Sequence, residues 1–239
     1  HIERRFGMVW PESPVAKLRE LVLALRAIWE CWQTNGKLNF RGEYFKLTLM
    51  SPFFNPGPIP HPRIPIYIAG VNTGLARLCG EVCDGFHVHP FHTVGYLRDV
   101  LRPAIAEGAA KTGRAADSIA LAASVFAITS PAEREYARSQ VAFYASTPSY
   151  RPVLEHHGWG AIGEQLSGLA ARGAWAEMPA LVSDAMLGEF AVEAPLGALA
   201  APLRARYAGQ LDRITLYRPF APGGDDAGWQ KLARELAEK

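Results

Sequence analysis

Hydrophobic positions in the first third of the chain predict one long helix and a hairpin. Ser13-Pro14 is typical of a helix start, and Asn35-Gly36 is typical of a helix end. Between them, apolar residues recur at helical spacing as one wide stripe: Leu18, Leu21, Val22, Leu25, Ile28, Trp29 and Trp32. Residues 37–50 hold two aromatic-rich runs on either side of Arg41-Gly42, which predicts a β-hairpin. The proline-rich stretch 51–65 predicts an ordered loop.

From residue 64 onward, short apolar runs alternate with helical patterns. The runs are apolar without alternation, which favours strands buried on both faces of a parallel sheet. The predicted strands are 64–69, 86–89, 119–128 and 211–217. The predicted helices are 74–83, 94–111 (with a kink near Pro103), 131–146 and 229–238.

Residues 147–209 break this alternation. They contain helical patterns at 161–172, 179–189 and 196–207, and no strand is predicted among them. We therefore expect a helical insertion between the last two strands. Alternating strands and helices predict an α/β fold with right-handed crossovers. Four parallel strands in a single domain over residues 1–239 fit the second half of a (β/α)8 barrel, because a complete barrel takes about 250 residues.

Composition narrows the class of protein. A net charge of +2 gives no support for a nucleic-acid or membrane-surface partner. No apolar run reaches the roughly 18 residues that a membrane span needs. The three cysteines, Cys31, Cys79 and Cys83, are too few for a disulfide framework, so we expect a cytoplasmic protein. The first residue is His1 rather than Met, which suggests a processed chain or a fragment.

The turn after the first parallel strand is a candidate anion site. Gly70, Val71, Asn72 and Thr73 lie between that strand and the helix that begins near Gly74. Free N–H groups of a first helical turn and the positive end of the helix dipole favour a phosphate there. Gly70 would allow close approach, and Asn72 or Thr73 could add a side-chain donor. Glycine also occurs in such turns only to permit the turn, so the pattern alone leaves both interpretations open.

His87 and His89 are the second candidate. Alternation on a strand places both side chains on one face, at the carboxyl end where barrel enzymes carry functional residues. The pair could face a cofactor or substrate, be buried for structural reasons, or bind a metal as in some barrel hydrolases. The strand ends at 127–130 and 216–220 offer no further His, Asp or Glu ligand, so we predict no metal site.

Other candidates are weaker. Arg4 and Arg5 could bind an anion, although such pairs often face solvent. Cys79 and Cys83 lie four residues apart on one helix face and are best explained as small packing residues. His156-His157 and Trp159 lie in the insertion, where they could cover a pocket or simply lie at the surface.

Four segments together resemble the luciferase-like monooxygenase superfamily, and within it the flavin- or deazaflavin-dependent oxidoreductases that use coenzyme F420. The segments are HIERRFGMVW, LRELVLALRAIWECW, FRGEYFKLTLMSPFF and IPIYIAGVNTGLARLCGEVCDGFHVHPF. The resemblance implies a (β/α)8 barrel with an insertion after the seventh strand. It also implies hydride transfer between F420, or alternatively FMN, and a small organic substrate. The turn at Gly70–Thr73 and the strand end from Gly85 to His89 would hold the cofactor phosphate.

The same resemblance implies that strands one to four of the barrel are absent from this chain. Those strands usually carry the residue nearest the hydride, so no catalytic residue is assigned. Half a barrel would leave an open sheet edge, and we expect a second copy to cover it in a homodimer. The alternatives are a non-catalytic half-barrel that only binds a phosphorylated ligand, and a metal-dependent hydrolase using His87 and His89.

Overall fold

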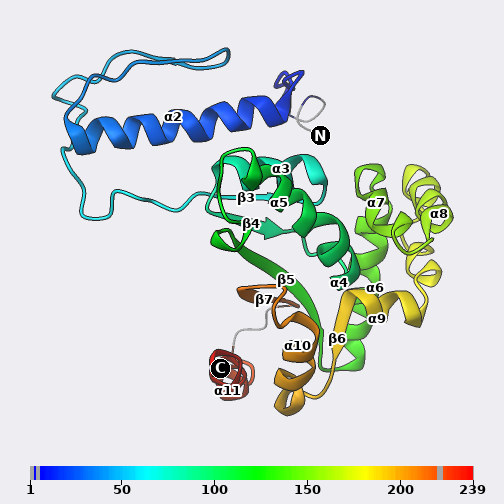
Figure 1. Ribbon diagram of the computed structural model, residues 1–239. Helices are drawn as coiled ribbons and strands as arrows, with labels where there is room; N and C mark the ends of the chain where they lie inside the picture. Colours follow the sequence, from blue (N-terminus) through cyan, green and yellow to red (C-terminus); the bar gives the residue numbers. More distant parts are fainter. Residues whose placement is uncertain (1–2, 4–5, 220–222, 239) are drawn as a thin grey trace.

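A computed structural model describes residues 3, 6–219 and 223–238 of the chain (Figure 1). Arg4 and Arg5 lie outside the described residues. The long predicted helix is α2 (Pro14–Thr34), with Pro14 in its first turn and Asn35 in the left-handed conformation at its end, at φ 50°. The predicted hairpin is the antiparallel pair β1 (Phe40–Arg41) and β2 (Lys46–Leu47). The proline-rich stretch is an extended connector.

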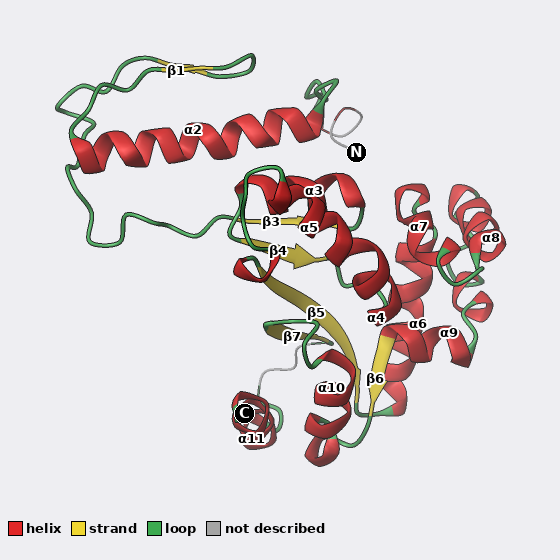
Figure 2. Cartoon of the chain, in the orientation of Figure 1, coloured by secondary structure: helices red, strands yellow, loops and turns green. Residues whose placement is uncertain are grey.

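A carboxylate of α2 fixes the hairpin turn. Glu20 accepts hydrogen bonds from the backbone N–H groups of Glu43, Tyr44 and Phe45 at 2.9, 2.9 and 2.5 Å. Gly42 makes room for this carboxylate, because a Cβ there would lie 2.0 Å from Glu20 Oε1. Helix α2 lies next to α3 at one side of the molecule, and the hairpin lies on the side of α2 that faces away from the sheet (Figure 2).

A five-stranded parallel sheet forms the centre of the chain (Figure 2). Its strands are β3 (Tyr67–Gly70), β4 (Gly85–Val88), β5 (Ala120–Ile128), β6 (Ala191–Glu193) and β7 (Arg213–Tyr217). The first half of β5 pairs with β4, its last three residues pair with β6, and β7 also pairs with β5. The prediction of an α/β fold with a parallel sheet is confirmed.

Two strand predictions were wrong in detail. The strand expected over 64–69 runs instead from Tyr67 to Gly70, because prolines at 62 and 65 cannot donate a ladder hydrogen bond. The insertion was expected to hold no strand, but it contains β6. Three residues are too few for any periodicity to reveal a strand, and β6 exists because the far end of β5 offers it an edge.

Two helices cover one face of the sheet and pack closely on each other. These are α3 (Thr73–Val82) and α5 (Arg102–Ala110). A Cβ added at Gly80 would lie 2.0 Å from the carbonyl oxygen of Ile105, and one at Gly108 would lie 1.9 Å from that of Arg77. The two glycines therefore permit the crossing. The disturbance predicted near Pro103 takes the form of a π-helical turn, η1 (Leu97–Leu101), between the short helix α4 (Val94–Tyr96) and α5.

Apart from the short turn η2 directly before β5, the remaining helices follow β5 and surround the carboxyl ends of the strands and the sheet's far edge (Figure 1). Helix α6 begins after Ser130, whose hydroxyl accepts the N–H of Glu133. The final helix begins after Asp225, whose carboxylate accepts the N–H of Gly228. The bounds are η2 (Ala116–Ser118), α6 (Pro131–Ala145), η3 (Pro148–Tyr150), α7 (Arg151–Glu155), α8 (Gly160–Ala171), η4 (Met178–Leu181), α9 (Asp184–Phe190), η5 (Leu196–Ala198), α10 (Ala200–Tyr207) and α11 (Asp226–Ala237).

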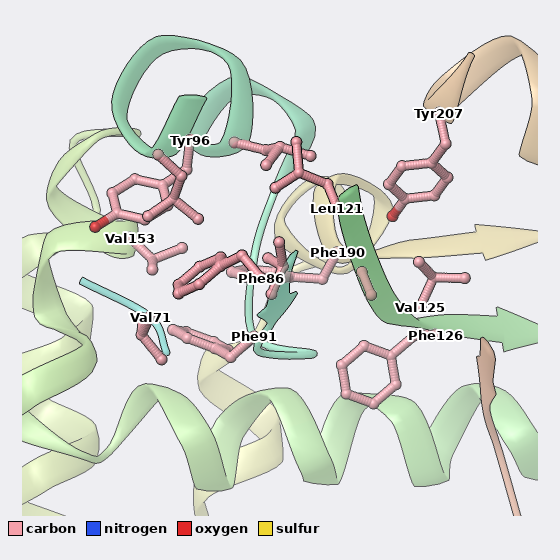
Figure 3. Packing of buried hydrophobic residues seen from close by; sticks show 14 of the residues in the cluster. Val71, Phe86, Phe91, Tyr96, Leu121, Val125, Phe126, Val153, Phe190 and Tyr207 are labelled. Carbon is pink, nitrogen blue, oxygen red and sulfur yellow. The ribbon is translucent and has the colours of Figure 1, made fainter. Parts of the chain in front are cut away.

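Helices cover one face of the sheet and leave residues on the other face exposed. Phe86, Val88 and Leu121 are buried on the face that carries α3 and α5. Figure 3 shows Phe86 and Leu121 in this packing. On the other face His87 and Arg213 are exposed. In a complete barrel that second face would be the interior. Within the described residues, no helix is both long enough and apolar enough to span a bilayer.

Candidate functional site

The carboxyl ends of β3 and β4 meet at one edge of the sheet. Gly70 and Val88 are partners in the parallel register, and the N–H of His89 donates to the carbonyl of Gly70 at 3.2 Å. The chain leaves β3 through Val71 and Asn72 and enters α3 at Thr73. The turn at Gly70–Thr73 and His89 are therefore neighbours, two segments that the family resemblance had grouped together.

The start of α3 has features that suit an anion. Asn72 precedes the helix in an extended conformation, and its side chain makes no capping bond to the first-turn N–H groups. Its amide instead donates to the carbonyl of Ser149 at 2.7 Å, while its Oδ1 is buried without a partner. The Asn72 side chain does not cap the N–H groups of the first turn of α3. These N–H groups can therefore donate to a bound phosphate.

A cation and a hydroxyl adjoin the same turn. The Thr73 hydroxyl accepts a hydrogen bond from Arg77 Nη1 at 3.1 Å, and Arg77 also pairs with Glu107 at 2.6 Å. This places a guanidinium one helical turn from the helix start, where it adds to the positive end of the dipole. A hydroxyl and a guanidinium are both side-chain groups that can bind a phosphate.

The other two turn residues contribute backbone and packing. The Val71 side chain is buried and lies near Phe91 in the core (Figure 3), so only its backbone can serve a ligand. A Cβ at Gly70 would lie 3.0 Å from Leu75 and 3.2 Å from Phe86. Glycine at position 70 therefore avoids a close contact with these two side chains, whatever binds beside it.

His89 lies directly beyond β4 in an aromatic setting. Its ring centroid is 4.8 Å from that of Tyr144 and 4.8 Å from that of Tyr150. Its Nδ1 accepts a hydrogen bond from the N–H of Phe91 at 3.1 Å. Burial lowers the pKa of His89 to about 4, so the ring is neutral at physiological pH.

Sequence reasoning missed the tyrosines at this edge. The hydroxyl groups of Tyr144 and Tyr217 are 2.9 Å apart, and that of Tyr217 also donates to Gln140 Oε1 at 3.2 Å. Burial raises the pKa of Tyr217 to about 12. Tyr217 closes a predicted strand and could have been found from the rule that barrels carry function at carboxyl ends. Tyr144 and Tyr150 carried no such signal, because they lie in α6 and η3.

His87 and Gly85 are not at this edge. His87 is opposite Ala69 within the strand, and its ring centroid is 5.3 Å from that of Tyr67. Gly85 begins β4 opposite Tyr67, three residues from Val88 and so about 10 Å from the Gly70 end. A Cβ at Gly85 would lie 2.1 Å from the Tyr67 ring, which gives this glycine a packing role. The predicted binding residues therefore separate into an edge group and two residues further down the strands.

The structure gives the metal hydrolase alternative no support. Over the described residues, no three His, Cys, Asp or Glu side chains gather as a metal site would require. The contacts of His87 and His89 differ as well, since His87 packs on Tyr67 and His89 packs on Tyr144 and Tyr150.

The contacts of two other predicted groups of residues indicate structural roles. Cys79 in α3 and Cys83 directly after this helix are free thiols and buried, in agreement with a packing role. His157 stacks on Trp159 with centroids 4.5 Å apart, and its Nε2 lies 2.8 Å from the hydroxyl of Thr93. These contacts join the insertion to the start of α4.

Comparisons of sequence place this chain among known proteins. The family model described as luciferase-like monooxygenase matches residues 1–213. An uncharacterized protein of Mycobacterium tuberculosis is 42% identical over 220 residues, which are 90% of this chain and 64% of that protein. An F420-dependent glucose-6-phosphate dehydrogenase of Nocardia farcinica is 38% identical over 112 residues, which are 46% of this chain and 31% of that enzyme. The chain thus spans about 64% of the length of the first of these relatives.

Solved structures agree on the fold. The coenzyme F420-dependent tetrahydromethanopterin reductase of Methanopyrus kandleri superposes with a TM-score of 0.67 at 21% identity, over 94% of this chain and 62% of that one. A long-chain alkane monooxygenase superposes with a TM-score of 0.59 at 15% identity, over 99% of this chain and 58% of that one. The predicted luciferase-like barrel type of fold is confirmed, although the described strands form an open sheet.

Proposed function

Because the chain belongs to the luciferase-like monooxygenase family, we propose that it forms the phosphate-holding part of an F420-dependent oxidoreductase acting on a small organic molecule. Bound there, F420 would supply the hydride chemistry, while the protein would orient and insulate it. FMN is the second candidate cofactor. Relatives that share 30 to 38% identity with part of this chain are named F420-dependent glucose-6-phosphate dehydrogenases, which favours F420.

The observation that carries the proposal is the start of α3. First-turn N–H groups without a side-chain cap, the Thr73 hydroxyl and the Arg77 guanidinium gather at the carboxyl end of a parallel strand. In open and closed α/β folds, that end of the sheet is where phosphorylated ligands bind. In this proposal Gly70, Val71, Asn72 and Thr73 hold the phosphate through backbone N–H groups, and His89 lines the adjoining wall.

The remaining predicted residues take a different place in the proposal. His87 would face the space beneath the cofactor, on the uncovered side of the sheet, while Gly85 would act through the packing of Tyr67. No residue is given a catalytic role. We further propose a homodimer in the cytoplasm, where three buried, unpaired cysteines stay reduced.

The substitution Thr73→Pro tests the phosphate site with little expected damage to the fold. Position 73 is the first residue of α3, where proline is favoured, and the extended Asn72 (φ −104°, ψ 163°) suits a residue that precedes proline. Proline removes one N–H donor and the hydroxyl. Since a hydrogen bond to a charged group is worth about 1.5–3 kcal/mol, we expect F420 to bind about 10- to 100-fold more weakly.

Thr73→Ala is the matched control, because it removes the hydroxyl and keeps the N–H. Fluorescence titration of the full-length protein with oxidised F420, and separately with FMN, measures both variants and the parent. We expect Thr73→Ala to fall between parent and Thr73→Pro. If neither cofactor binds the full-length protein, the proposal fails. Binding of a phosphorylated ligand without any turnover would instead support the non-catalytic alternative.

A further inference from the structure

A cavity of about 330 Å³ lies at the amino ends of β3 and β4, and arginines dominate its lining. Asp84 lines it, directly before β4, and accepts the N–H of Ile66, directly before β3, at 2.7 Å. The cavity is therefore at the opposite end of the sheet from the turn proposed for the cofactor phosphate. The arginines in its lining are Arg19, Arg26, Arg63 and Arg114, and the acidic residues are Glu81 and Asp84.

The four guanidinium groups come from three separate parts of the chain. Arg19 and Arg26 lie two helical turns apart on one face of α2. Arg63 lies in the connector that Figure 1 shows running back to the start of β3, and Arg114 lies in the loop between α5 and η2. Segments that are distant in sequence thus converge on one concavity, as they do in small-molecule sites.

The lining carries an excess of positive charge. Two arginines pair with the two carboxylates: Arg19 with Glu81 at 2.6 Å, and Arg26 with Asp84 at 2.8 Å. Among the described residues, no carboxylate pairs with Arg63, which is exposed, or with Arg114, which is half-buried. Two positive charges therefore remain in one concave site. Such a site raises the local concentration of anions.

Two of these arginines are held in place by the last turn of α3. Arg26 donates to the carbonyl of Val82 from Nε at 3.3 Å and from Nη2 at 3.0 Å, and Arg114 Nη1 donates to the carbonyl of Gly80 at 3.1 Å. A guanidinium has five N–H donors, so these bonds occupy only part of each group. Both guanidinium groups are fixed before a ligand arrives, which lowers the entropy cost of binding.

Capping of α3 explains part of this arrangement. The last carbonyl groups of a helix lack partners within it, and Arg26 and Arg114 supply them. Capping does not explain Arg63, whose guanidinium lines the same cavity from the connector. It also does not explain why two further positive charges are placed beside two pairs that are already neutral.

The size and charge of the cavity suit a small phosphomonoester. A volume of about 330 Å³ is near the lower end for small-molecule sites. A phosphomonoester carries a charge of about −1.5 to −2 at pH 7, which matches the excess of two positive charges. Guanidinium groups bind phosphate oxygens in a bidentate manner. Leu23 and Val82 add apolar surface for a short carbon skeleton.

We propose that this cavity is a second ligand site, which binds a small organic phosphomonoester. Arg63 and Arg114 hold the phosphate, and Arg26 adds a third guanidinium. The site is separate from the cofactor turn and goes beyond the proposed function. A ligand bound here joins the connector and α2 to the loop after α5, so it stabilises the fold from the amino ends of the strands.

Glycerol 3-phosphate is the probe, and glycerol is the matched uncharged probe. Each is titrated by calorimetry into the full-length parent protein and into Thr73→Pro, whose cofactor turn is weakened. We expect glycerol 3-phosphate to bind both proteins equally well and, at saturation, to raise the Tm by about 2 °C or more. Glycerol should do neither. Absence of binding at millimolar glycerol 3-phosphate, or loss of binding in Thr73→Pro, would overturn the proposal.

Arg63→Gln removes one charge and leaves the bonds to α3 intact, so we expect glycerol 3-phosphate to bind about tenfold more weakly. Arg41→Gln is the matched control, since it removes an exposed arginine of the hairpin whose Nε bonds to Asn39. It should bind as the parent does. Equal weakening by both substitutions would show an effect of net charge alone and would contradict the proposal.

Glu81→Gln separates binding from a purely structural role of the cluster. It removes a negative charge from the lining and releases Arg19, so we expect tighter binding of glycerol 3-phosphate. Arg19 is about half exposed, so loss of the pair should cost the fold little. Unchanged or weaker binding in Glu81→Gln would count against the site.

F420 binding is measured separately on the same variants. We expect Arg63→Gln to bind F420 as the parent does, because the two sites lie at opposite ends of the strands. Binding of glycerol 3-phosphate as described, without any binding of F420 or FMN, would refute the proposed function and leave this site in place. The reverse result would remove this site alone.

Discussion

The two histidines of the β4–α4 loop show how single residues set the properties of this edge. His92 is 2% exposed and packs beside Tyr207, with ring centroids 5.9 Å apart, and Arg206 is close enough to disfavour a positive charge on it. Its Nδ1 is bonded to the His89 carbonyl, while its Nε2 is buried without a partner. A protonated His92 would therefore bring an uncompensated charge into the core.

That burial predicts a pH dependence of stability. Burial lowers the pKa of His92 from 6.5 to about 4 in the folded protein. Because the folded pKa is depressed, the unfolded chain binds more protons below pH 6.5, and the free energy of unfolding falls as pH decreases from 6.5 to 4. The 2.5-unit difference corresponds to a loss of about 3 kcal/mol. His89, whose pKa is lowered in the same direction, adds to the loss.

Urea denaturation at pH 7, 5.5 and 4.5 measures this loss. His92→Asn is the informative variant, since its amide can still donate to the His89 carbonyl but does not titrate. We expect the variant to be less stable at pH 7 because it leaves a cavity, and to lose clearly less stability than the parent on acidification. An equal loss in both proteins would show that His92 does not titrate as described.

At the scale of elements, the crossing of α3 and α5 depends on two glycines. A Cβ at Gly80 or Gly108 would collide with backbone oxygen of the facing helix, and backbone cannot move as a side-chain end can. We expect Gly80→Ala and Gly108→Ala each to destabilise the protein by about 1–3 kcal/mol or more. Thermal or urea unfolding measures the change.

Gly188 provides the control for these substitutions. It lies within α9 and has open space where a Cβ would be. Gly188→Ala should therefore stabilise the protein by up to about 1 kcal/mol through helix propensity alone. Stabilisation by alanine at position 80 or 108 as well would mean that the helices do not approach as closely as they do here.

Elements with long, regular patterns were predictable from sequence, and short ones were not. The stripe from Leu18 to Trp32 and the apolar run of β5 identified α2 and the longest strand, because many residues repeat the same period. The three residues of β6 carried no pattern, since their conformation is set by pairing with Phe126, Ala127 and Ile128. Whether such a short element forms therefore depends on its tertiary contacts.

Some residues of the candidate site were likewise predictable from sequence, and others were not. Gly70–Thr73 and His89 were predictable because a strand, a glycine turn and a helix follow one another in the sequence, and parallel strands bring their ends together. Gly85 was included with them because it is close in sequence, although it begins the strand that His89 follows. Tyr144 and Tyr150 could not be predicted, because only the folding of α6 and η3 over the sheet edge brings them to His89.

At the scale of the whole molecule, apolar side chains remain exposed around the connector that follows the hairpin. Leu49, Phe53 and Phe54 are 80%, 89% and 69% exposed. Within the described residues the sheet also keeps free edges at β3 and β7. Exposed apolar patches and open strand edges both favour association, and here we propose a second copy as the partner.

Light scattering coupled to gel filtration tests this proposal. We expect a dimer, and we expect the double variant Phe53→Ser/Phe54→Ser to raise the dimer dissociation constant at least about tenfold. Phe143→Ser, which alters an exposed phenylalanine in α6, should leave association unchanged. A monomeric parent protein, or equal effects of the two sets of substitutions, would contradict this surface as the contact.

Strand β5 pairs with β7, which follows much later in the sequence, and this has a consequence for synthesis of the protein. Thr215 of β7 is the register partner of Ser124 in β5, and its hydroxyl donates a hydrogen bond to the carbonyl of Ala123. Thr215 and Ala123 are 92 positions apart in the sequence. A ribosome adding about 5–20 residues each second needs about 5–20 s to make the intervening stretch. During that interval the nascent chain exposes the edge of its longest strand. Synthesis at a reduced rate would prolong this exposure, so the demand for chaperones should depend on translation speed.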